Sequence, residues 1–500
     1  MRASSPRLPS PLLPPHLLLL LLLPPPASPL TLTRHSLAAY PAAICSDGSP
    51  ASYYFLASPR PSSLWLVHLQ GGGWCWDASS CAARCGGGGY PLLCSSARWE
   101  ETYTAGGIFD APALAEASKA FVRYCTSDAH MGNGSAFGLQ FRGAAVVRAV
   151  LSSLVSRHGL AEGALVLFGG DSAGGRGAMV HLDGVAARLA AALRRPPAAV
   201  RVRGMIDSAM WLDLLPAKGA AFPGFARVTK LVHANAAVDV GADCAVRFPG
   251  EEWRCMFGED RLPLLATPYF AIGSQHDSYQ LSNDLPAGWQ SRSEYYAYLA
   301  AFSARTVELC LRIVNSTTRR AAYSSRCLRH AVSTQQQFFE PGCLDLSIEE
   351  ALVDFLRAAD AEEEARPGNN SLYVDLSACR ADRPHCSCCP TDWLEWYGEH
   401  LVLSGTLLAL VALSLFVGAS CCCWRYCGGV SRWGKSRSSY APRAKRRLSS
   451  FAWYARKLRR GEGGTPLTRS SGLGDSLSAR ELESNLQLTT GEILRVAPPL

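Results

Sequence analysis

One serine stands between two pairs of glycines, directly after an apolar run. Residues 164–179, ALVLFGGDSAGGRGAM, contain the pattern G-x-S-x-G centred on Ser172. The apolar run predicts a strand and the residues after Ser172 predict a helix, which is the strand–turn–helix setting of a nucleophile elbow. The N-terminus of such a helix favours negative charge that develops beside it. These residues predict a nucleophilic serine; the alternative is a glycine-rich turn that only leads into a helix.

A serine hydroxyl is a poor nucleophile by itself, and the oxyanion formed by its attack needs hydrogen-bond donors. The backbone N–H of Ala173, the residue after the serine, is one candidate donor. A second glycine run, Gly71 to Gly73, follows the apolar residues 64–70 and precedes Trp74, a candidate pocket residue. Glycine carries no side chain, so the N–H groups of this loop can approach a ligand closely. A phosphate-binding loop is the competing interpretation, but no Lys or Thr follows the glycines as that motif requires.

The base and its orienting acid should follow the serine in the chain, with the acid first. Asp277 comes shortly after an apolar run at 267–274, and His330 lies in the polar stretch SSRCLRHAVS. Asp207 also ends an apolar run, so it could replace Asp277 or shape the pocket. The residues alone do not choose the histidine, because the same part of the chain contains others, among them His130, His233 and His276.

These motifs fall on an alternation of two patterns. Short apolar runs, which predict buried strands, alternate with stretches of helical periodicity. The strand candidates are 64–70, 164–170, 202–207 and 267–274, and the helix candidates are 143–159 and 178–195. This alternation predicts an α/β fold with a mostly parallel sheet flanked by helices. No long linker, repeat or charge block interrupts residues 38–365, which we expect to form one catalytic domain.

Segments at both ends of the chain point to a membrane. Residues 1–27 combine a basic start, a run of leucines and small residues near a cleavage site, as secretory signal peptides do. Residues 401–423 carry no charge and are long enough to span a bilayer. Aromatic residues before this segment and basic residues after it orient the tail, 424–500, toward the cytoplasm. We therefore expect a single-pass type I membrane protein whose catalytic domain is extracellular or in the secretory lumen.

The formal net charge of +8 belongs to the predicted tail. Residues 424–500 hold 15 of the 49 Lys and Arg but only 5 of the 41 Asp and Glu. The rest of the chain is close to neutral, which argues against a nucleic-acid partner. The tail is rich in Ser, Gly and Arg, and we expect it to be disordered. Its basic segment either lies near an anionic inner leaflet or is simply solvated.

Fifteen of the 19 cysteines precede the predicted span, where an oxidising compartment predicts that many of them form disulfides. The odd number leaves at least one free or bonded to another chain. Residues 366–400 resemble a Cys-rich stalk before the membrane. The cluster HCSCC in this stalk lacks the paired spacing of metal ligands, and we expect no metal and no cofactor. Sequons for glycosylation on the same side of the membrane are at Asn133, Asn315 and Asn369.

Several separated motifs together resemble the pectin acetylesterase/Notum family of serine esterases. In chain order they are WLVHLQGGGWCWDASSC, VRYC, FRGAAVVRAVL, GDSAGGRGAM, IDSAMWLD, TPYFAIGSQHDSYQ and CLRHAVS, within residues 39–340. The resemblance implies an α/β-hydrolase-like fold with Ser172 as nucleophile, Asp277 as orienting acid and His330 as general base. It further implies an oxyanion hole formed by the backbone of Gly72, Gly73 and Ala173.

Three positions depart from the family pattern. Gln70 stands where family members usually carry an acidic residue, and Asp171 stands where they carry a small residue or Cys. A carboxylate beside the nucleophile would oppose an oxyanion if it pointed inward, but we expect the elbow geometry to turn it away. Gly73 stands where the lipid-cleaving animal branch carries an aromatic residue. This resembles plant polysaccharide acetylesterases and removes part of the wall of an acyl pocket.

Together these features predict a membrane-anchored carboxylesterase that hydrolyses O-acyl esters. The preferred substrate is an acetyl group on a cell-wall or matrix polysaccharide. One alternative keeps the chemistry but removes a fatty acyl group from a secreted protein, which requires a deep apolar tunnel beside Ser172. Another is an inactive, receptor-like ectodomain that binds a ligand; the intact set of Ser172, Asp277 and His330 argues against it.

Overall fold

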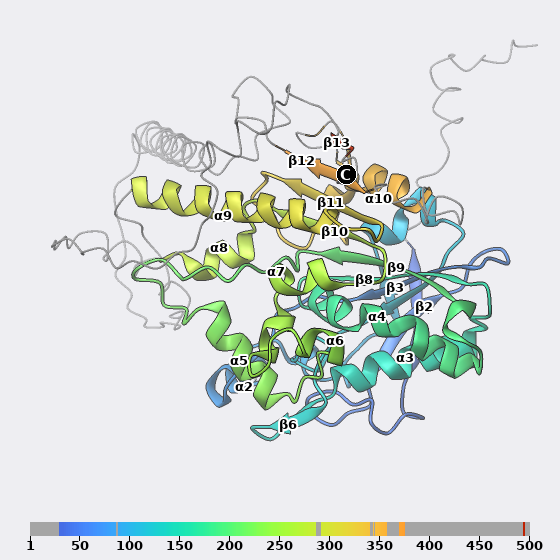
Figure 1. Cartoon of the computed structure of the whole chain (residues 1–500). Helices are drawn as coiled ribbons and strands as arrows, with labels where there is room; N and C mark the ends of the chain where they lie inside the picture. Colours follow the sequence, from blue (N-terminus) through green and yellow to red (C-terminus); the bar gives the residue numbers. More distant parts are fainter. Residues whose placement is uncertain are drawn as a thin grey trace, which may run out of the picture. The chain divides into compact units, whose positions relative to one another are not determined.

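Most strands of the domain join in one twisted sheet (Figure 1). The computed structural model describes residues 30–86, 89–286, 292–340, 344, 346–357, 370–375 and 494–495, and all of these belong to one compact unit. The strands of the sheet are β1 (Thr31–Ser36), β2 (Ser52–Leu56), β3 (Leu64–Leu69), β4 (Thr102–Thr104), β5 (Ser118–Val122), β8 (Leu165–Asp171), β9 (Arg201–Asp207), β10 (Tyr269–Ser274), β11 (Arg320–Ser325), β12 (Ser371–Val374) and β13 (Leu494–Arg495).

Parallel pairing dominates this sheet. The strand order is β13-β12-β11-β10-β9-β8-β3-β5-β2-β1-β4, and every pair from β12 to β5 is parallel. The strands β2, β1 and β4 continue one edge in antiparallel pairing, and β13 pairs antiparallel with β12 at the other edge. The loops that follow the parallel strands therefore gather along one edge of the sheet, where α/β proteins bind their ligands.

Helices lie between the strands along the chain. They are α2 (Ala78–Cys85), α3 (Gly143–His158), α4 (Ala173–Leu193), α5 (Phe225–Asn235), α6 (Ala242–Ala245), α7 (Gly258–Arg261), α8 (Ser278–Asp284), α9 (Arg292–Val314) and α10 (Ile348–Arg357). The long helix α4 packs on β8 and β9 and against α3, whereas α9 packs on β11 and β12 (Figure 1). A separate hairpin pairs β6 (Gly134–Ala136) with β7 (Leu139–Phe141).

The predicted α/β fold with a mostly parallel sheet is confirmed. The predicted strands correspond to β3, β8, β9 and β10, whose residues are almost all buried, as expected for the middle of a parallel sheet. The helix predicted to start after Ser172, with helical periodicity over 178–195, is α4, which begins at Ala173. Glycines near its start disfavour a helix in isolation, but they allow close packing: a Cβ on Gly175 would lie 2.4 Å from the Asp207 carbonyl oxygen.

The domain extends further than predicted. β12 lies within residues 366–400, which the sequence assigns to a stalk, yet it pairs in parallel with β11. Leu372 and Tyr373 on this strand are buried in the core. A stalk that begins at residue 366 is therefore wrong, because the apolar strand at 371–374 completes the sheet.

Disulfides occur in the described part of the chain, as the cysteine count predicts. They join Cys45 to Cys125, Cys75 to Cys81, Cys85 to Cys94, and Cys244 to Cys255. Cys327 is also disulfide-bonded, and Cys310 is a buried free thiol. The disulfide between Cys75 and Cys81 links α2 to the loop after β3, which carries Gly72 and Gly73.

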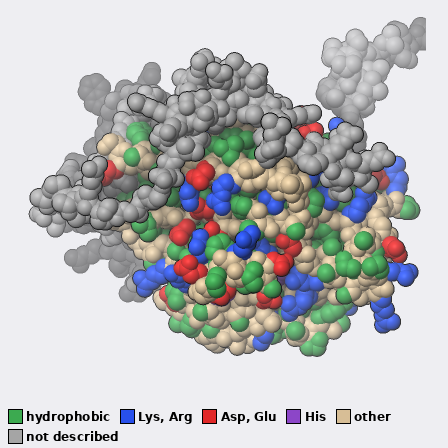
Figure 2. All heavy atoms as spheres, in the orientation of Figure 1, with side chains coloured by type: hydrophobic (Ala, Val, Ile, Leu, Met, Phe, Trp, Pro, Cys, Tyr) green, Lys and Arg blue, Asp and Glu red, His purple; other side chains and the backbone are tan. Residues whose placement is uncertain are grey.

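Several predictions concern residues that the structure does not describe. The signal peptide (1–27), the membrane span (401–423), most of the tail and the sequon at Asn369 are among them. No helix in the described ranges combines the length and apolarity needed to cross a membrane. Asn133 and Asn315 are exposed, so glycans could reach both. On the face of the domain shown in Figure 2, basic and acidic side chains are interspersed.

Candidate active site

Ser172 occupies a strained turn between β8 and α4. Its backbone has φ +54° and ψ −117°, a conformation that residues other than glycine seldom adopt. The N–H of Ser172 donates to the carbonyl oxygen of Asp207 on β9 at 2.9 Å. Helix α4 begins at the next residue. The structure thus places Ser172 on the kind of elbow that presents a serine at the carboxyl edge of a parallel sheet.

The glycines of the G-x-S-x-G pattern stand where a side chain has no room. A Cβ on Gly174 would lie 1.9 Å from the carbonyl oxygen of Leu69, and one on Gly170 would lie 2.5 Å from the carbonyl carbon of Gly174. The obstructing atoms are backbone, which cannot rotate aside as a side chain can. These two glycines therefore allow α4 to begin directly against the end of β3.

Replacing Gly174 with alanine should destabilise the fold by roughly 3 kcal/mol, because the added methyl group must displace the backbone of β3. The midpoint of urea unfolding measures this loss. Gly106→Ala is the matched control, since a Cβ there would meet nothing closer than 3.8 Å. Equal midpoints for the two variants would contradict the close contact at the elbow.

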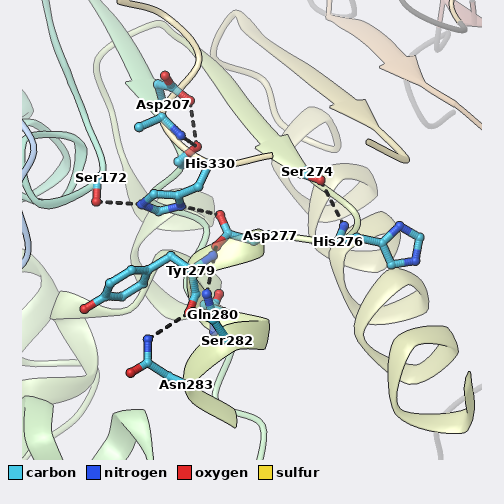
Figure 3. A network of polar contacts seen from close by, with 12 residues as sticks. Ser172, Asp207, Ser274, His276, Asp277, Tyr279, Gln280, Ser282, Asn283 and His330 are labelled. Carbon is cyan, nitrogen blue, oxygen red and sulfur yellow. Dashed lines mark hydrogen bonds and ion pairs between the residues drawn. The ribbon is translucent and has the colours of Figure 1, made fainter. Parts of the chain in front are cut away.

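The structure brings Ser172, His330 and Asp277 together in one line of hydrogen bonds (Figure 3). Nε2 of His330 is 2.7 Å from Oγ of Ser172, and Nδ1 of His330 is 2.7 Å from Oδ2 of Asp277. All three residues are largely buried. This arrangement can pass a proton from the serine hydroxyl to an imidazole whose other nitrogen is held by a carboxylate.

The carboxylate of Asp277 is itself held in place by the helix that follows it. Asp277 is the N-cap of α8, and its Oδ1 accepts hydrogen bonds from the N–H groups of Tyr279 and Gln280 at 3.0 and 2.9 Å. Oδ2 is left to face His330. His276, the residue directly before the N-cap, does not make this contact: its Nδ1 bonds to the carbonyl oxygen of Arg326, and its ring points away from Ser172 in Figure 3.

Asp207 positions the loop that carries His330 and makes no hydrogen bond to its ring. Oδ1 accepts from the Ser208 hydroxyl at 2.8 Å, and Oδ2 accepts from the N–H of Ser333 at 2.7 Å. The same Ser208 hydroxyl oxygen accepts from the N–H of Ala331 at 2.8 Å. The ambiguity between the two acids in the sequence is resolved by this geometry: Asp277 faces the imidazole, and Asp207 anchors the backbone beside it.

The glycine loop after β3 lies alongside the elbow. A Cβ on Gly71 would be 3.1 Å from Cβ of Ser172. Gly72 and Gly73 have φ values of +138° and +68°, which favour glycine, and Nη2 of Arg84 donates to the carbonyl oxygen of Gly72 at 2.6 Å. Within the described residues, the N–H groups of Gly72 and Gly73 donate to no backbone acceptor, so they are available to a ligand oxygen.

Asp171, the acid beside the nucleophile, turns away from the serine as expected. Its Oδ1 is 2.9 Å from Nε2 of the buried His68 and accepts from the N–H of Gly71 at 3.3 Å. It thereby ties β8 to the first residue of the glycine loop. Gln70 has a comparable structural role, because its side-chain oxygen accepts from the N–H of Tyr124 at 3.0 Å.

The acids around His330 stabilise its protonated form. Burial lowers the pKa of His330, but the charge and hydrogen bond of Asp277, together with the charges of Asp207 and Asp171, raise it more. The net result is a pKa above the ordinary value for histidine.

Ester hydrolysis should therefore fall on acidification at a higher pH than an unperturbed histidine would cause. Below its pKa the imidazole is protonated and cannot accept the serine proton; above it, the neutral base is available. The acidic limb of kcat/KM should have its midpoint above the unperturbed value of 6.5. A midpoint at or below that value, with folding unchanged by fluorescence over the same range, would contradict the raised pKa.

Two aromatic residues that the sequence did not single out complete the surroundings of His330. The Tyr279 ring stacks on the imidazole, with centroids 5.2 Å apart, and the Trp211 ring meets it edge-on at 6.1 Å. Trp211 comes four residues after Asp207, and Tyr279 comes two residues after Asp277. Their closeness in the sequence to two predicted acids could have identified them as residues of the site. Within the described ranges, no three His, Cys, Asp or Glu side chains converge as metal ligands would.

A strained serine elbow at the carboxyl edge of a parallel sheet, with an acid and a histidine from two later loops, defines an α/β hydrolase. Comparison with known proteins agrees with this class. The solved structure of the Wnt deacylase Notum from Drosophila matches with a TM-score of 0.60 and 26% sequence identity, and the match covers 71% of this chain and 99% of that one.

Sequence comparisons narrow the class. Residues 27–366 match the family model described as Pectinacetylesterase. The palmitoleoyl-protein carboxylesterase notum2 of Xenopus laevis is 28% identical over 383 residues, which is 73% of this chain and 76% of the relative. The palmitoleoyl-protein carboxylesterase NOTUM of Homo sapiens is 29% identical over 387 residues, 73% of this chain and 74% of the relative. The chain belongs to the pectinacetylesterase family and is a carboxylic ester hydrolase.

Proposed function

We propose that the protein hydrolyses O-acyl esters by covalent catalysis from Ser172. The observation that carries this proposal is the pair of 2.7 Å contacts that link Ser172 through His330 to Asp277. Oγ of Ser172 attacks the ester carbonyl carbon while Nε2 of His330 takes the hydroxyl proton. The carbonyl oxygen, now negative, accepts hydrogen bonds from the backbone N–H groups of Gly72, Gly73 and Ala173.

The second half of the cycle uses the same groups. The intermediate collapses and releases the alcohol, which takes its proton from His330, and an acyl group remains on Ser172. Water then attacks the acyl carbonyl carbon as His330 removes its proton. The second tetrahedral intermediate releases the carboxylic acid and restores the Ser172 hydroxyl. Asp277 keeps the imidazole in the required tautomer throughout.

For the substrate we propose an acetyl group on a polysaccharide. The observation in favour is the space beside Gly73. A Cβ there would have Nη1 of Arg84 at 3.6 Å and the Tyr279 hydroxyl at 3.8 Å, so this part of the site is bordered by polar groups. A sugar and a short acyl group suit such borders better than a long hydrocarbon chain does.

The comparisons favour a second candidate, removal of a fatty acyl group from a secreted protein. The relatives from Xenopus laevis and Homo sapiens are palmitoleoyl-protein carboxylesterases by name, and the structure that resembles this one is that of a Wnt deacylase. This candidate requires room for a long apolar chain beside Ser172.

The test uses the full-length protein purified in detergent and its Ser172→Ala variant. Release of acetate from an acetylated polysaccharide is measured beside release of palmitoleate from an acylated peptide. Turnover of the polysaccharide that depends on Ser172 would support the first candidate, and turnover of the peptide alone would replace it with the second. Nitrophenyl acetate and nitrophenyl octanoate are assayed as well. If none of these four substrates is hydrolysed in a way that depends on Ser172, the proposed esterase activity is overturned.

We also propose that the domain is held on the outer or lumenal side of a membrane by residues 401–423. Disulfides and exposed sequons at Asn133 and Asn315 support this side. In the structure, β13 near the C-terminus pairs with β12 of the domain. A C-terminal tail on the other side of the membrane could not make this pairing, so the proposed span and this pairing exclude each other. Protease treatment of intact cells that express a C-terminally tagged chain distinguishes them: a protected tag supports the span, and a cleaved tag contradicts it.

A further inference from the structure

Arg176 is buried between two tryptophan rings beside the elbow. Its Cζ lies 3.9 Å from the ring centroid of Trp74 and 3.9 Å from that of Trp211. Only 1% of the residue is exposed. Favourable contact between a guanidinium and the faces of both indoles stabilises the charge there, and Nε and Nη2 are out of contact with solvent.

This guanidinium has no acidic partner among the described residues. Nε and Nη2 lack any hydrogen-bond acceptor, and burial lowers the pKa of Arg176 to about 9. In Arg254, by contrast, the same two nitrogens are paired with an acid: Nε and Nη2 each donate to the carboxylate of Asp260 at 3.0 Å. A buried cation without such a partner is costly, so its position next to the nucleophile points to a role in function.

Arg176 lies one helical turn after Ser172. Its N–H donates to the carbonyl oxygen of Ser172 at 2.9 Å, and side chains on a helix lean toward its N-terminus. Trp74 directly follows Gly73 in the chain, and Trp211 meets the ring of His330. The stack of Trp74, Arg176 and Trp211 therefore connects the loop of the oxyanion donors to the surroundings of the base.

We propose that Arg176 determines acyl-chain specificity by closing the space beside Ser172 to long apolar acyl groups. This inference rests on the proposed esterase activity and deepens it. Because Trp74 directly follows Gly73, we expect an acyl group whose carbonyl oxygen is bound at the glycine loop to extend beside the Trp74 ring. The indole face that a hydrocarbon chain would pack against is occupied by the guanidinium.

A long chain can enter only by displacing the guanidinium or by lying against it. Either event exposes a desolvated cation to hydrocarbon without giving it a hydrogen-bond acceptor, which is unfavourable. An acetyl group ends before it reaches the stack and leaves the stack intact. Arg176 is thus a specificity residue that acts on the length of the acyl group and takes no proton in the reaction.

The experiment compares kcat/KM for nitrophenyl acetate and nitrophenyl octanoate in the full-length protein, Arg176→Ala and Arg176→Met. The alanine removes the guanidinium, whereas the methionine removes its charge and keeps most of its bulk. We expect the octanoate-to-acetate ratio to rise by about tenfold or more in Arg176→Ala, as a pocket opened by several methylene groups permits. The rise in Arg176→Met should be smaller.

The ratio separates specificity from general damage, because a destabilised enzyme loses activity on both esters alike. Arg254→Ala is the matched control: this arginine also packs on an aromatic ring, that of Phe248 at 4.4 Å, and its ratio should not change. An unchanged ratio in a folded Arg176→Ala overturns the proposal. If that variant does not fold, Arg176→Met decides, with a rise of roughly threefold supporting the proposal and an unchanged ratio overturning it. Absence of turnover in the parent protein would overturn the esterase activity instead.

Discussion

Replacing Ser172 with alanine should lower kcat for ester hydrolysis by roughly 10⁴- to 10⁶-fold, the range found when a serine hydrolase loses its nucleophile. The variant retains the N–H donors of the glycine loop and still binds substrate, but it cannot form the acyl-enzyme. The fold should be unaffected, because the hydroxyl of Ser172 bonds to His330 and to no other described residue. Steady-state release of nitrophenol from nitrophenyl acetate measures the loss.

Ser282→Ala is the control for this experiment. Ser282 lies on α8 near the same site (Figure 3), is exposed, and donates its hydroxyl to the carbonyl oxygen of Tyr279. Loss of this hydroxyl should leave kcat within about twofold of the value for the parent protein, since a surface hydroxyl outside the proton relay contributes little to catalysis or stability. Substantial activity in folded Ser172→Ala would show that another group attacks the ester, and the assignment of the nucleophile would be wrong.

Replacing Asp277 with asparagine should lower kcat by about 10⁴-fold while leaving the protein folded. Asparagine is a good N-cap, so its Oδ1 can still accept from Tyr279 and Gln280 at the start of α8. Its amide nitrogen then faces Nδ1 of His330, which must accept a hydrogen bond and carry its proton on Nε2. That tautomer cannot take the proton of Ser172.

Asp207→Asn distinguishes the two acids that the sequence left open. Asp207 makes no hydrogen bond to the ring of His330; it anchors the neighbouring backbone through Ser208 and the N–H of Ser333 and acts on the imidazole otherwise through its charge. Its loss should therefore reduce kcat far less than the loss of Asp277. Kinetics at a pH above the acidic limb, with melting temperatures measured for both variants, provide the comparison. A larger loss in Asp207→Asn would identify Asp207 as the orienting acid and contradict the observed geometry.

The nucleophile and its immediate surroundings could be predicted from the sequence. Ser172, the flanking glycines and Ala173 act within one strand–turn–helix segment, where backbone conformation is set by neighbouring residues. The glycine loop after β3 was also predictable. Three consecutive glycines after a buried strand favour a loop whose backbone adopts positive φ values, which other residues seldom do. The orientation of Asp171 away from Ser172 was also expected, from the geometry of the elbow.

The start of α4 after Ser172 could be predicted from the sequence, but the packing role of the glycines there could not. Glycines lower the local preference for a helix, and only the close approach of Leu69 and Asp207 shows why they are there. The true end of the domain was missed because β12 is short and gains its stability from pairing with β11, a partner that no local pattern reveals.

The sequence by itself determined the chemistry of this protein: a serine on an elbow, an oxyanion loop, and a short set of acids and histidines to assist it. The residue pattern left the acid and the histidine open, and the family resemblance pointed to Asp277 and His330. Only the tertiary structure brings them into contact, because His330 is 158 residues from Ser172 and 53 from Asp277. Contacts over such separations depend on how the strands are ordered in the sheet. The same holds for Arg176, whose residue type is visible beside the serine but whose isolation between Trp74 and Trp211 exists only once three distant segments have packed together.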